Sequence, residues 1–220
     1  MNTPFILNFL RGLQANNSKT WMDENRDGYL QAKQYFTELV AFTLDELKGI
    51  DPALHKVSPA ECLFRINKND FSKKGEAPYK GRFGAGISPG GRHSAYSNYI
   101  LVLEPGNRSR VGGGMPNPRP ERLEKVRQEI DYNPGELEAI LNDPVFRASY
   151  GDLQGKALRG VPKGYKKDHP ALPLLKYKSY AALHHFSDEE VCSPDFKARL
   201  LPYFETVKPL QEFLNRTLED

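Results

Sequence analysis

The feature that most constrains the fold is residues 97–114, SNYILVLEPGNRSRVGGG. Residues 99–103 form a nearly continuous apolar run, which predicts a strand covered on both faces. Pro105, Gly106 and Asn107 are turn-forming residues, and residues 108–111 begin a second extended segment. The stretch therefore predicts a β-hairpin, and with it an antiparallel sheet.

Helical patterns lie on both sides of this hairpin. Residues 21–47 carry apolar side chains at steps of seven or four, which is the helix period. A first short helix has Thr3 as its expected N-cap. Further helices are expected at residues 118–130, at 134–141 and from Pro144 onward. Residues 194–214 predict a helical region that Pro202 and Pro209 kink or split.

Two other segments alternate with the period of a strand. They are ECLFRINK at residues 61–68 and KYKSYAALHH at residues 176–185. Helices at both ends with strands in the middle predict an α+β fold. We expect a single domain over residues 1–220, with a mostly antiparallel central sheet and long N-terminal and C-terminal helices packed on it.

The bulk composition indicates an ordinary globular chain. It has 220 residues, of which 39% are hydrophobic and 27% charged. No segment approaches the roughly 20 apolar residues of a membrane-spanning helix, and the first residues lack the basic region of a signal peptide. Cys62 and Cys192 are isolated in the sequence, so we expect reduced thiols and a cytoplasmic protein. Trp21 and Phe36 are expected in the core.

Positive charge is concentrated in two segments. Residues 65–82 contain six Lys or Arg and two acidic residues, and residues 156–178 contain seven and one, whereas the net charge of the whole chain is +3. A concentration of one sign produces a local potential that the net charge conceals. Such runs are also common on solvated faces that bind nothing. The sequence leaves open whether the two segments meet in space.

The first basic segment contains the candidate ligand-binding residues. Pro78 fixes the backbone beside Tyr79 and Lys80, which presents a phenol and an ammonium group at a defined angle. A planar guanidinium, a point charge and a neutral donor are complementary ways to hold a phosphate or a carboxylate. The predicted site consists of Arg65, Lys68, Tyr79, Lys80 and Arg82, joined by Lys163 and Lys178 from the second basic segment.

Other kinds of site receive little support from the sequence. GRFGAG at residues 81–86 lacks the following helix of a dinucleotide loop, so it is interpreted as a turning connection. His184 and His185 are adjacent on a predicted strand, so they point to opposite faces and do not share a metal ion. No common hydrolase motif occurs. We therefore predict no metal and no cofactor.

Five stretches of the chain resemble one known family. They are NFLRGLQANNSKTWMDENRDGY, FRINKNDFSKKGEAPYKGRFGAG, YILVLEPGNRSRVGGGM, PKGYKKDHPALPLLKYKSY and CSPDFKARLLPYFETVKPLQEFLNR. The chain resembles the domain of unknown function 2461 family, conserved hypothetical proteins of bacteria. The resemblance covers nearly the whole chain and supports its fold and boundaries, but it implies no reaction.

The chain departs from the pattern of that family at one point. Lys68 and Asn69 stand where the family pattern has Arg and Asp, although Arg65, Pro78, Tyr79 and Lys80 are kept. Lysine is a point charge and cannot reproduce the bidentate fork of arginine. The resemblance therefore implies that a site built on an Arg-Asp pair is altered here.

Three classes of function remain open from the sequence. The first is binding of a small phosphorylated or carboxylated ligand in a basic cleft, with or without catalysis. The second is nucleic-acid binding through the two basic segments, although the chain lacks a helix-turn-helix or RNA-recognition signature. The third is a structural or regulatory partner protein without a pocket. We rank them in this order, with no membrane partner and no prediction of oligomeric state.

Overall fold

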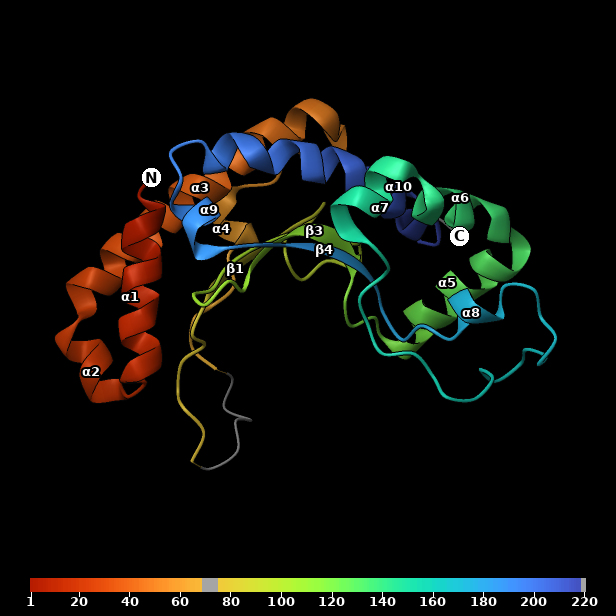
Figure 1. The fold of residues 1–220 in the computed structure, drawn as a ribbon, viewed down its shortest axis with the longest axis horizontal. Helices are drawn as coiled ribbons and strands as arrows, with labels where there is room; N and C mark the ends of the chain where they lie inside the picture. The colour runs from red at the N-terminus through yellow and green to blue at the C-terminus, as the bar shows by residue number, and fades with distance from the viewer. Residues whose placement is uncertain (69–74, 219–220) are drawn as a thin grey trace. The chain divides into compact units, whose positions relative to one another are not determined.

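The computed structural model describes residues 1–68 and 75–218 of the chain. Helices precede and follow a run of three consecutive strands, and a fourth strand comes after four more helices (Figure 1). The four strands form one sheet in the order β1-β2-β3-β4. The strands are β1 (Phe83–Ile87), β2 (Asn98–Leu103), β3 (Ser109–Met115) and β4 (Tyr180–Phe186). The predicted α+β fold with an antiparallel sheet is confirmed. The hairpin predicted at residues 97–114 is β2 and β3.

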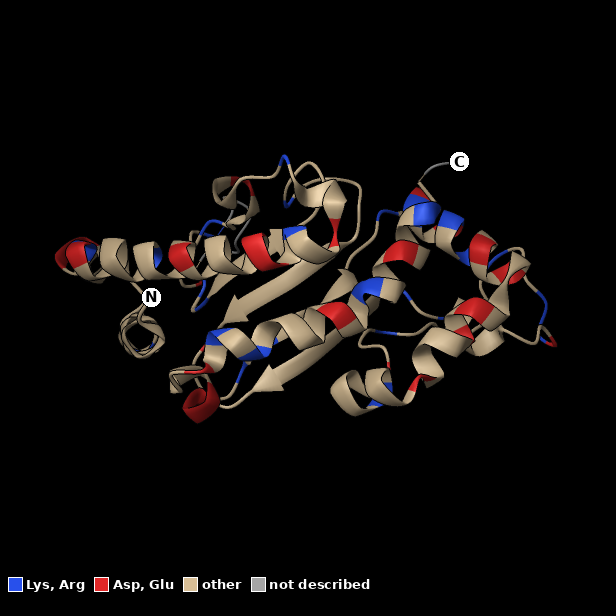
Figure 2. Cartoon of the chain, turned by 90° about the horizontal axis from the view of Figure 1, so that it is seen from above, with Lys and Arg blue, Asp and Glu red and all other residues tan. Residues whose placement is uncertain are grey.

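Helices are the most common element in the described part of the chain. They are α1 (Thr3–Ala15), α2 (Lys19–Glu24), α3 (Arg26–Ile50), η1 (Pro52–Leu54), α4 (Pro59–Cys62), α5 (Pro120–Tyr132), α6 (Pro134–Asn142), α7 (Pro144–Tyr150), α8 (Leu172–Leu175), α9 (Asp188–Cys192), η2 (Phe196–Arg199) and α10 (Leu200–Arg216). Acidic and basic residues are interspersed along the helices, whereas the strands carry almost no charge (Figure 2). None of the helices that the structure describes has the length and apolar composition needed to cross a membrane.

The chain divides into two compact units. Unit 1 comprises Met1–Ser94, Tyr99–Val111 and His185–Pro202, and unit 2 comprises Ala95–Asn98, Gly112–His184 and Tyr203–Asp220. The sequence did not predict this division, because each unit is assembled from three separated segments. The expectation of one domain over residues 1–220 stays a prediction.

Unit 1 has an aromatic core between its long helix and the first strand. Phe36 of α3 is 1% exposed and stacks on Phe83 of β1, with ring centroids 5.4 Å apart. Phe9 of α1 stacks on the same ring at 6.4 Å. The predicted core position of Phe36 is confirmed. Trp21 is only half-buried, with its indole against Phe9 at 5.8 Å, so it lies at the border of the core.

In unit 2 the C-terminal helix packs on β3. Val207 and Gln211 of α10 lie directly against Gly113. Of the expected kink or split at its prolines, the split is wrong, because α10 runs unbroken from Leu200 to Arg216 with Pro209 inside it. The kink stays a prediction. Pro202 stands in the first turn of the helix, where a backbone N–H has no partner within the helix, so it interrupts nothing.

Two other local predictions, a helix at residues 21–47 and a strand at residues 61–68, are corrected by the structure. The helix expected over residues 21–47 is interrupted at Asn25, whose side-chain amide donates to the carbonyl of Trp21 and ends α2. Residues 59–62 form helix α4 and not the start of a strand, because Ser58 and Glu61 make a capping box. Only single bridges remain beyond it, from Leu63 to Ala85 and from Asn67 to Tyr79.

The glycine-rich segment after residue 80 is a strand and not a turning connection. Residues 83–87 are β1, fully buried, and they pair antiparallel with β2 from Phe83↔Leu103 to Ile87↔Tyr99. Glycine has low strand propensity, so the local pattern concealed a strand that tertiary pairing stabilises.

Candidate functional site

Residues 65–68 and 75–82 form the two arms of an irregular hairpin in unit 1, and residues 69–74 between them lie outside the described residues. The backbone N–H of Lys68 donates to the carbonyl of Pro78 at 2.9 Å, and that of Lys80 donates to the carbonyl of Ile66 at 2.7 Å. Asn17, which follows α1, fixes this hairpin, because its side-chain amide bonds both the N–H and the carbonyl of Tyr79 at 3.1 and 2.9 Å. Hydrogen bonds to the backbone therefore fix this segment at the residues for which the sequence predicts ligand contacts.

Two predicted ligand residues of this hairpin contact each other. The Nζ of Lys80 donates to the carbonyl of Arg65 at 2.9 Å. Burial, followed by the nearby positive charge of Arg82, lowers the pKa of the Lys80 amine. The side chain of Arg65 is exposed, and Lys68 lies 3.9 Å from Glu76 in an exposed ion pair. Three polar residues of this segment lie outside the described residues. They are Lys73, Lys74 and Asn69, and at Asn69 the chain departs from the family pattern.

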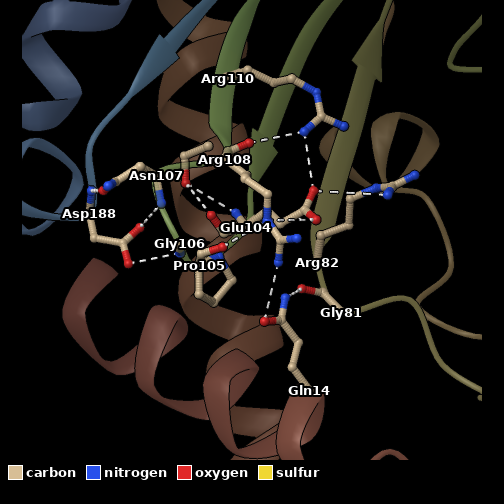
Figure 3. Close-up of polar contacts among 11 residues, drawn as sticks. Gln14, Gly81, Arg82, Glu104, Pro105, Gly106, Asn107, Arg108, Arg110 and Asp188 are labelled. Carbon is tan, nitrogen blue, oxygen red and sulfur yellow. Dashed lines mark hydrogen bonds and ion pairs between the residues drawn. The ribbon is translucent and has the colours of Figure 1, made fainter.

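Arg82 leads to a cluster of arginines that the sequence did not predict. Glu104 ends β2, and its carboxylate lies 3.1 Å from Arg110, 3.4 Å from Arg108 and 3.9 Å from Arg82. Figure 3 shows the three guanidinium groups converging on this carboxylate from the segment before β1 and from the β2–β3 hairpin. The Glu104 side chain is 13% exposed, whereas Arg82 and Arg108 are 44% and 54% exposed.

Gln14 of α1 joins the two sides of this cluster. Its Nε2 donates to the carbonyl of Gly81 at 2.7 Å, and its Oε1 accepts from Nη2 of Arg108 at 3.3 Å (Figure 3). One amide therefore fixes the backbone beside Arg82 and the side chain of Arg108. We call Glu104, Arg82, Arg108, Arg110 and Gln14 the Glu104 cluster.

The turn that carries Arg108 is fixed by Asp188 at the start of α9. The Asp188 carboxylate accepts from the backbone N–H groups of Gly106 and Asn107 at 2.9 and 3.0 Å, and from Arg11 at 2.8 Å. Burial raises the pKa of this carboxyl, but these hydrogen bonds outweigh it and the pKa lies below its usual value. Asn107 has a φ of 59°, a left-handed conformation that asparagine tolerates better than most residues.

The charges of this region do not balance. Four guanidinium groups, from Arg11, Arg82, Arg108 and Arg110, share two carboxylates, which leaves a surplus of two positive charges. Guanidinium groups donate hydrogen bonds but do not exchange protons near neutral pH. The arrangement therefore combines a surplus of positive charge with hydrogen-bond donors, which suits the binding of an anion.

Lys163 and Lys178 belong to unit 2 and are described apart from this cluster. Both side chains are exposed, and neither forms an ion pair within the described part of the chain. The backbone N–H of Lys178 donates to the carbonyl of Lys156 at 2.9 Å. This hydrogen bond joins the two ends of the second basic segment, residues 156–178.

The chain is similar to one family of proteins over nearly its whole length. The chain matches the model of the family described as conserved hypothetical protein (DUF2461) over residues 5–213. The chain belongs to this family. No curated protein and no solved structure matches it. Family membership confirms the resemblance, but it assigns no ligand.

Of the predicted site residues, all of which are described, only Arg82 belongs to the Glu104 cluster, through its contact with Glu104. Its partners were missed, although one signal was present in the sequence. The sequence predicts that an extended segment begins at Arg108, so Arg108 and Arg110, two residues apart, are expected on one face, with Glu104 across the turn from them. Gln14 and Asp188 had no such signal. Within the described residues, no three His, Cys, Asp or Glu side chains gather where a metal ion could bind.

Proposed function

We propose that the chain binds a small phosphorylated or carboxylated ligand at the Glu104 cluster. The observation that supports this function is the convergence of three guanidinium groups on a single carboxylate, which neutralises only one of them. The remaining N–H donors of Arg82 and Arg108 are accessible to solvent. A phosphate or carboxylate accepts two parallel hydrogen bonds from one such guanidinium.

The contacts around the cluster reduce the cost of ordering these side chains. Glu104 and Gln14 hold Arg108 from two directions, and Asp188 holds the turn that carries it. A binding group that is already oriented loses less conformational entropy when the ligand arrives. Lys80 lies two residues before Arg82, and its amine is a further cation of the predicted site in this segment.

The proposal is tested by calorimetric titration with inorganic phosphate and with pyrophosphate. Arg82→Gln and Arg108→Gln should each weaken binding about tenfold or more, because a hydrogen bond to a charged group contributes about 1.5–3 kcal/mol. Arg199→Gln is the matched control, since Arg199 is in the same unit but forms a one-to-one pair with Glu190 at 2.9 Å.

The control separates a site from a simple effect of net charge. Each of the three variants removes one positive charge, so Arg199→Gln should leave binding unchanged. Equal losses in all three variants would mean that binding depends on net charge alone. No loss in the two cluster variants would mean that Arg82 and Arg108 serve only to stabilise the fold around Glu104. Lys80→Met then tests whether the predicted hairpin residues extend the site.

A second candidate function, nucleic-acid binding, is supported by a different feature of unit 2. Lys156, Arg159, Lys163, Lys166 and Lys167 are exposed, and none forms an ion pair within the described part of the chain. Binding to a phosphate backbone releases counterions, so affinity for single-stranded or double-stranded DNA should fall steeply with salt. Substituting Lys166 and Lys167 by Gln should reduce that slope by about 2. A flat salt dependence would exclude this function.

A further inference from the structure

The Glu104 cluster holds more positive charge than its one carboxylate neutralises. All three of its arginines lie within 3.9 Å of the Glu104 carboxylate, and no other Asp or Glu of the described residues forms an ion pair with any of them. Asp188 does not reduce this surplus, because it is already paired with Arg11 at 2.8 Å. The surplus of two charges is neutralised only in part by a singly charged anion, and in full by a doubly charged one.

The three guanidinium groups differ in how many of their donors the protein already uses. Arg110 donates through Nη1 to Glu104 and to the carbonyl of Arg108, at 3.1 and 3.0 Å. Arg108 donates through Nε to a backbone carbonyl at 3.1 Å and through Nη2 to Gln14 at 3.3 Å. Arg82 approaches Glu104 only to 3.9 Å, and its side chain makes no hydrogen bond within the described part of the chain. Arg82 therefore keeps its whole planar fork for a ligand, and Arg108 keeps Nη1.

Arg82 and Arg108 contact the same carboxylate, so one small anion can reach both of them. Nη1 of Arg82 is 3.9 Å from Oε2 of Glu104, and Nε of Arg108 is 3.4 Å from Oε1 of the same group. Gln14 fixes both sides through one amide, because it bonds the carbonyl of Gly81, next to Arg82, and Nη2 of Arg108. Figure 3 shows both guanidinium groups beside Glu104. The donors of a single anion site are therefore close together before a ligand arrives.

A phosphate monoester matches these donors better than a carboxylate does. A carboxylate has two oxygen atoms in one plane, and a bidentate contact with one guanidinium uses both of them. A phosphate monoester has three terminal oxygens in a tetrahedral arrangement, so two of them can contact the fork of Arg82 while the third accepts from Arg108. Its second pKa is about 6, so it carries close to two negative charges at neutral pH. It therefore fits both the surplus of charge and the two sets of donors.

We propose that the Glu104 cluster selects the doubly charged form of a phosphate monoester over singly charged anions, carboxylates included. Two phosphate oxygens accept from the fork of Arg82, and the third accepts from Arg108. Arg110 does not contact the ligand, because its Nη1 is committed to Glu104 and its side chain is only 21% exposed. It neutralises the carboxylate that would otherwise repel the phosphate. This inference rests on the function proposed above and narrows its ligand to a phosphate monoester.

Four small anions separate the effect of charge from that of shape. Above its second pKa of about 6, methyl phosphate carries two charges and three terminal oxygens. Methyl sulfate has the same three oxygens and one charge, dimethyl phosphate has two oxygens and one charge, and acetate is the planar carboxylate. Calorimetric titration of the wild-type protein at constant ionic strength measures each affinity. Methyl phosphate should bind at least about tenfold more tightly than each of the others, because attraction to the surplus grows with the charge of the ligand.

Three variants assign the two effects to residues. Arg82→Lys keeps the charge and loses the fork, so it should weaken methyl phosphate and methyl sulfate equally and leave the ratio of their affinities unchanged. Arg110→Gln removes a charge that the ligand does not contact, so it should reduce that ratio about threefold or more. Arg199→Gln removes a charge from a one-to-one ion pair in the same unit and should change neither affinity.

The results distinguish a failure of this inference from a failure of the proposed function. Suppose that acetate or methyl sulfate binds as tightly as methyl phosphate, and that Arg82→Gln and Arg108→Gln weaken all of them. The cluster then binds anions without selecting a phosphate monoester, and only this inference is wrong. If none of the four anions binds, or if binding does not respond to Arg82→Gln and Arg108→Gln, the proposed function is wrong as well. The comparison of anions uses the wild-type protein, so it decides the inference even if Arg110→Gln does not fold.

Discussion

Two glutamines, Gln14 in unit 1 and Gln211 in unit 2, occupy opposite environments. Gln14 is exposed to solvent, yet both ends of its amide are paired, with Gly81 and with Arg108. Gln211 is 3% exposed, yet neither end of its amide has a partner within the described residues. Solvent could satisfy the first amide without help from the protein, whereas the second has lost its access to solvent.

The same contrast holds for the arginines of the two units. Those of the Glu104 cluster are partly exposed and share a carboxylate, whereas Arg122 is half-buried and contacts a carbonyl. All five unpaired buried atoms found in the described residues belong to unit 2. The polar contacts of the Glu104 cluster are therefore expected to contribute to stability, whereas the unpaired atoms of Gln211 and Arg122 reduce it unless water pairs them.

The largest effect on stability is expected from the apolar core of unit 1, which sets the scale for the polar effects. Phe36→Ala should lower the free energy of unfolding by about 3–5 kcal/mol, because the ring is 1% exposed and stacks on Phe83. Urea denaturation measures the loss. Leu30→Ala is the control, since Leu30 is 48% exposed on the same helix and should change little. Wild-type stability of Phe36→Ala would mean that α3 does not pack on β1.

The next effect concerns the carboxylate of the Glu104 cluster. Glu104→Gln should lower the free energy of unfolding by about 1.5–3 kcal/mol, because it leaves three guanidinium groups without their shared anion. The same urea experiment at low and high salt measures it, and the loss should shrink as salt screens the repulsion. Glu46→Gln, at an exposed position of α3, is the control. A neutral Glu104→Gln would contradict the view that unit 1 gains stability from its polar contacts.

The local elements of unit 1 and unit 2 were predicted from the sequence where the pattern was strong. The hairpin of β2 and β3 was found because an apolar run, a turn and a second extended segment follow one another. Strand β1 was missed because Gly84 and Gly86 carry no strand signal, although pairing with β2 buries them. The capping box of Ser58 and Glu61 makes residues 59–62 a helix, although the residues that follow alternate like a strand.

The candidate sites were less predictable, because their contacts join distant parts of the chain. Arg82 was predicted from local charge, but its partner Glu104 is brought to it by the pairing of β1 with β2. Gln14 reaches Gly81 from α1, and Asp188 reaches the β2–β3 turn from α9. Gln211 had the sequence pattern of an ordinary helical residue, so its burial without a partner is visible only in the fold.

The comparison of the two amides is tested first in unit 2, without added ligand. Gln211→Met should raise the free energy of unfolding by about 1 kcal/mol, because it replaces an unpaired buried amide by an apolar side chain of similar size. Thermal and urea unfolding of the ligand-free protein measure this change. A loss of stability would show that solvent or another group already pairs the amide in the native state.

The smallest effect is expected from the other amide and has the opposite sign. Gln14→Met should lower the free energy of unfolding by about 0.5 kcal/mol, since it removes two hydrogen bonds whose net contribution is small at an exposed position. Gln34→Met is the control, because Gln34 is exposed and its one side-chain hydrogen bond is to Glu38 on the same helix. The Gln14→Met variant should also weaken phosphate binding slightly, because Arg108 loses one of the groups that orient it. Opposite signs for Gln14→Met and Gln211→Met, measured in the same buffer, would establish that solvent access and pairing, and not residue type, decide what each amide contributes. Equal signs would mean that the amide of Gln211 is already paired in the native state.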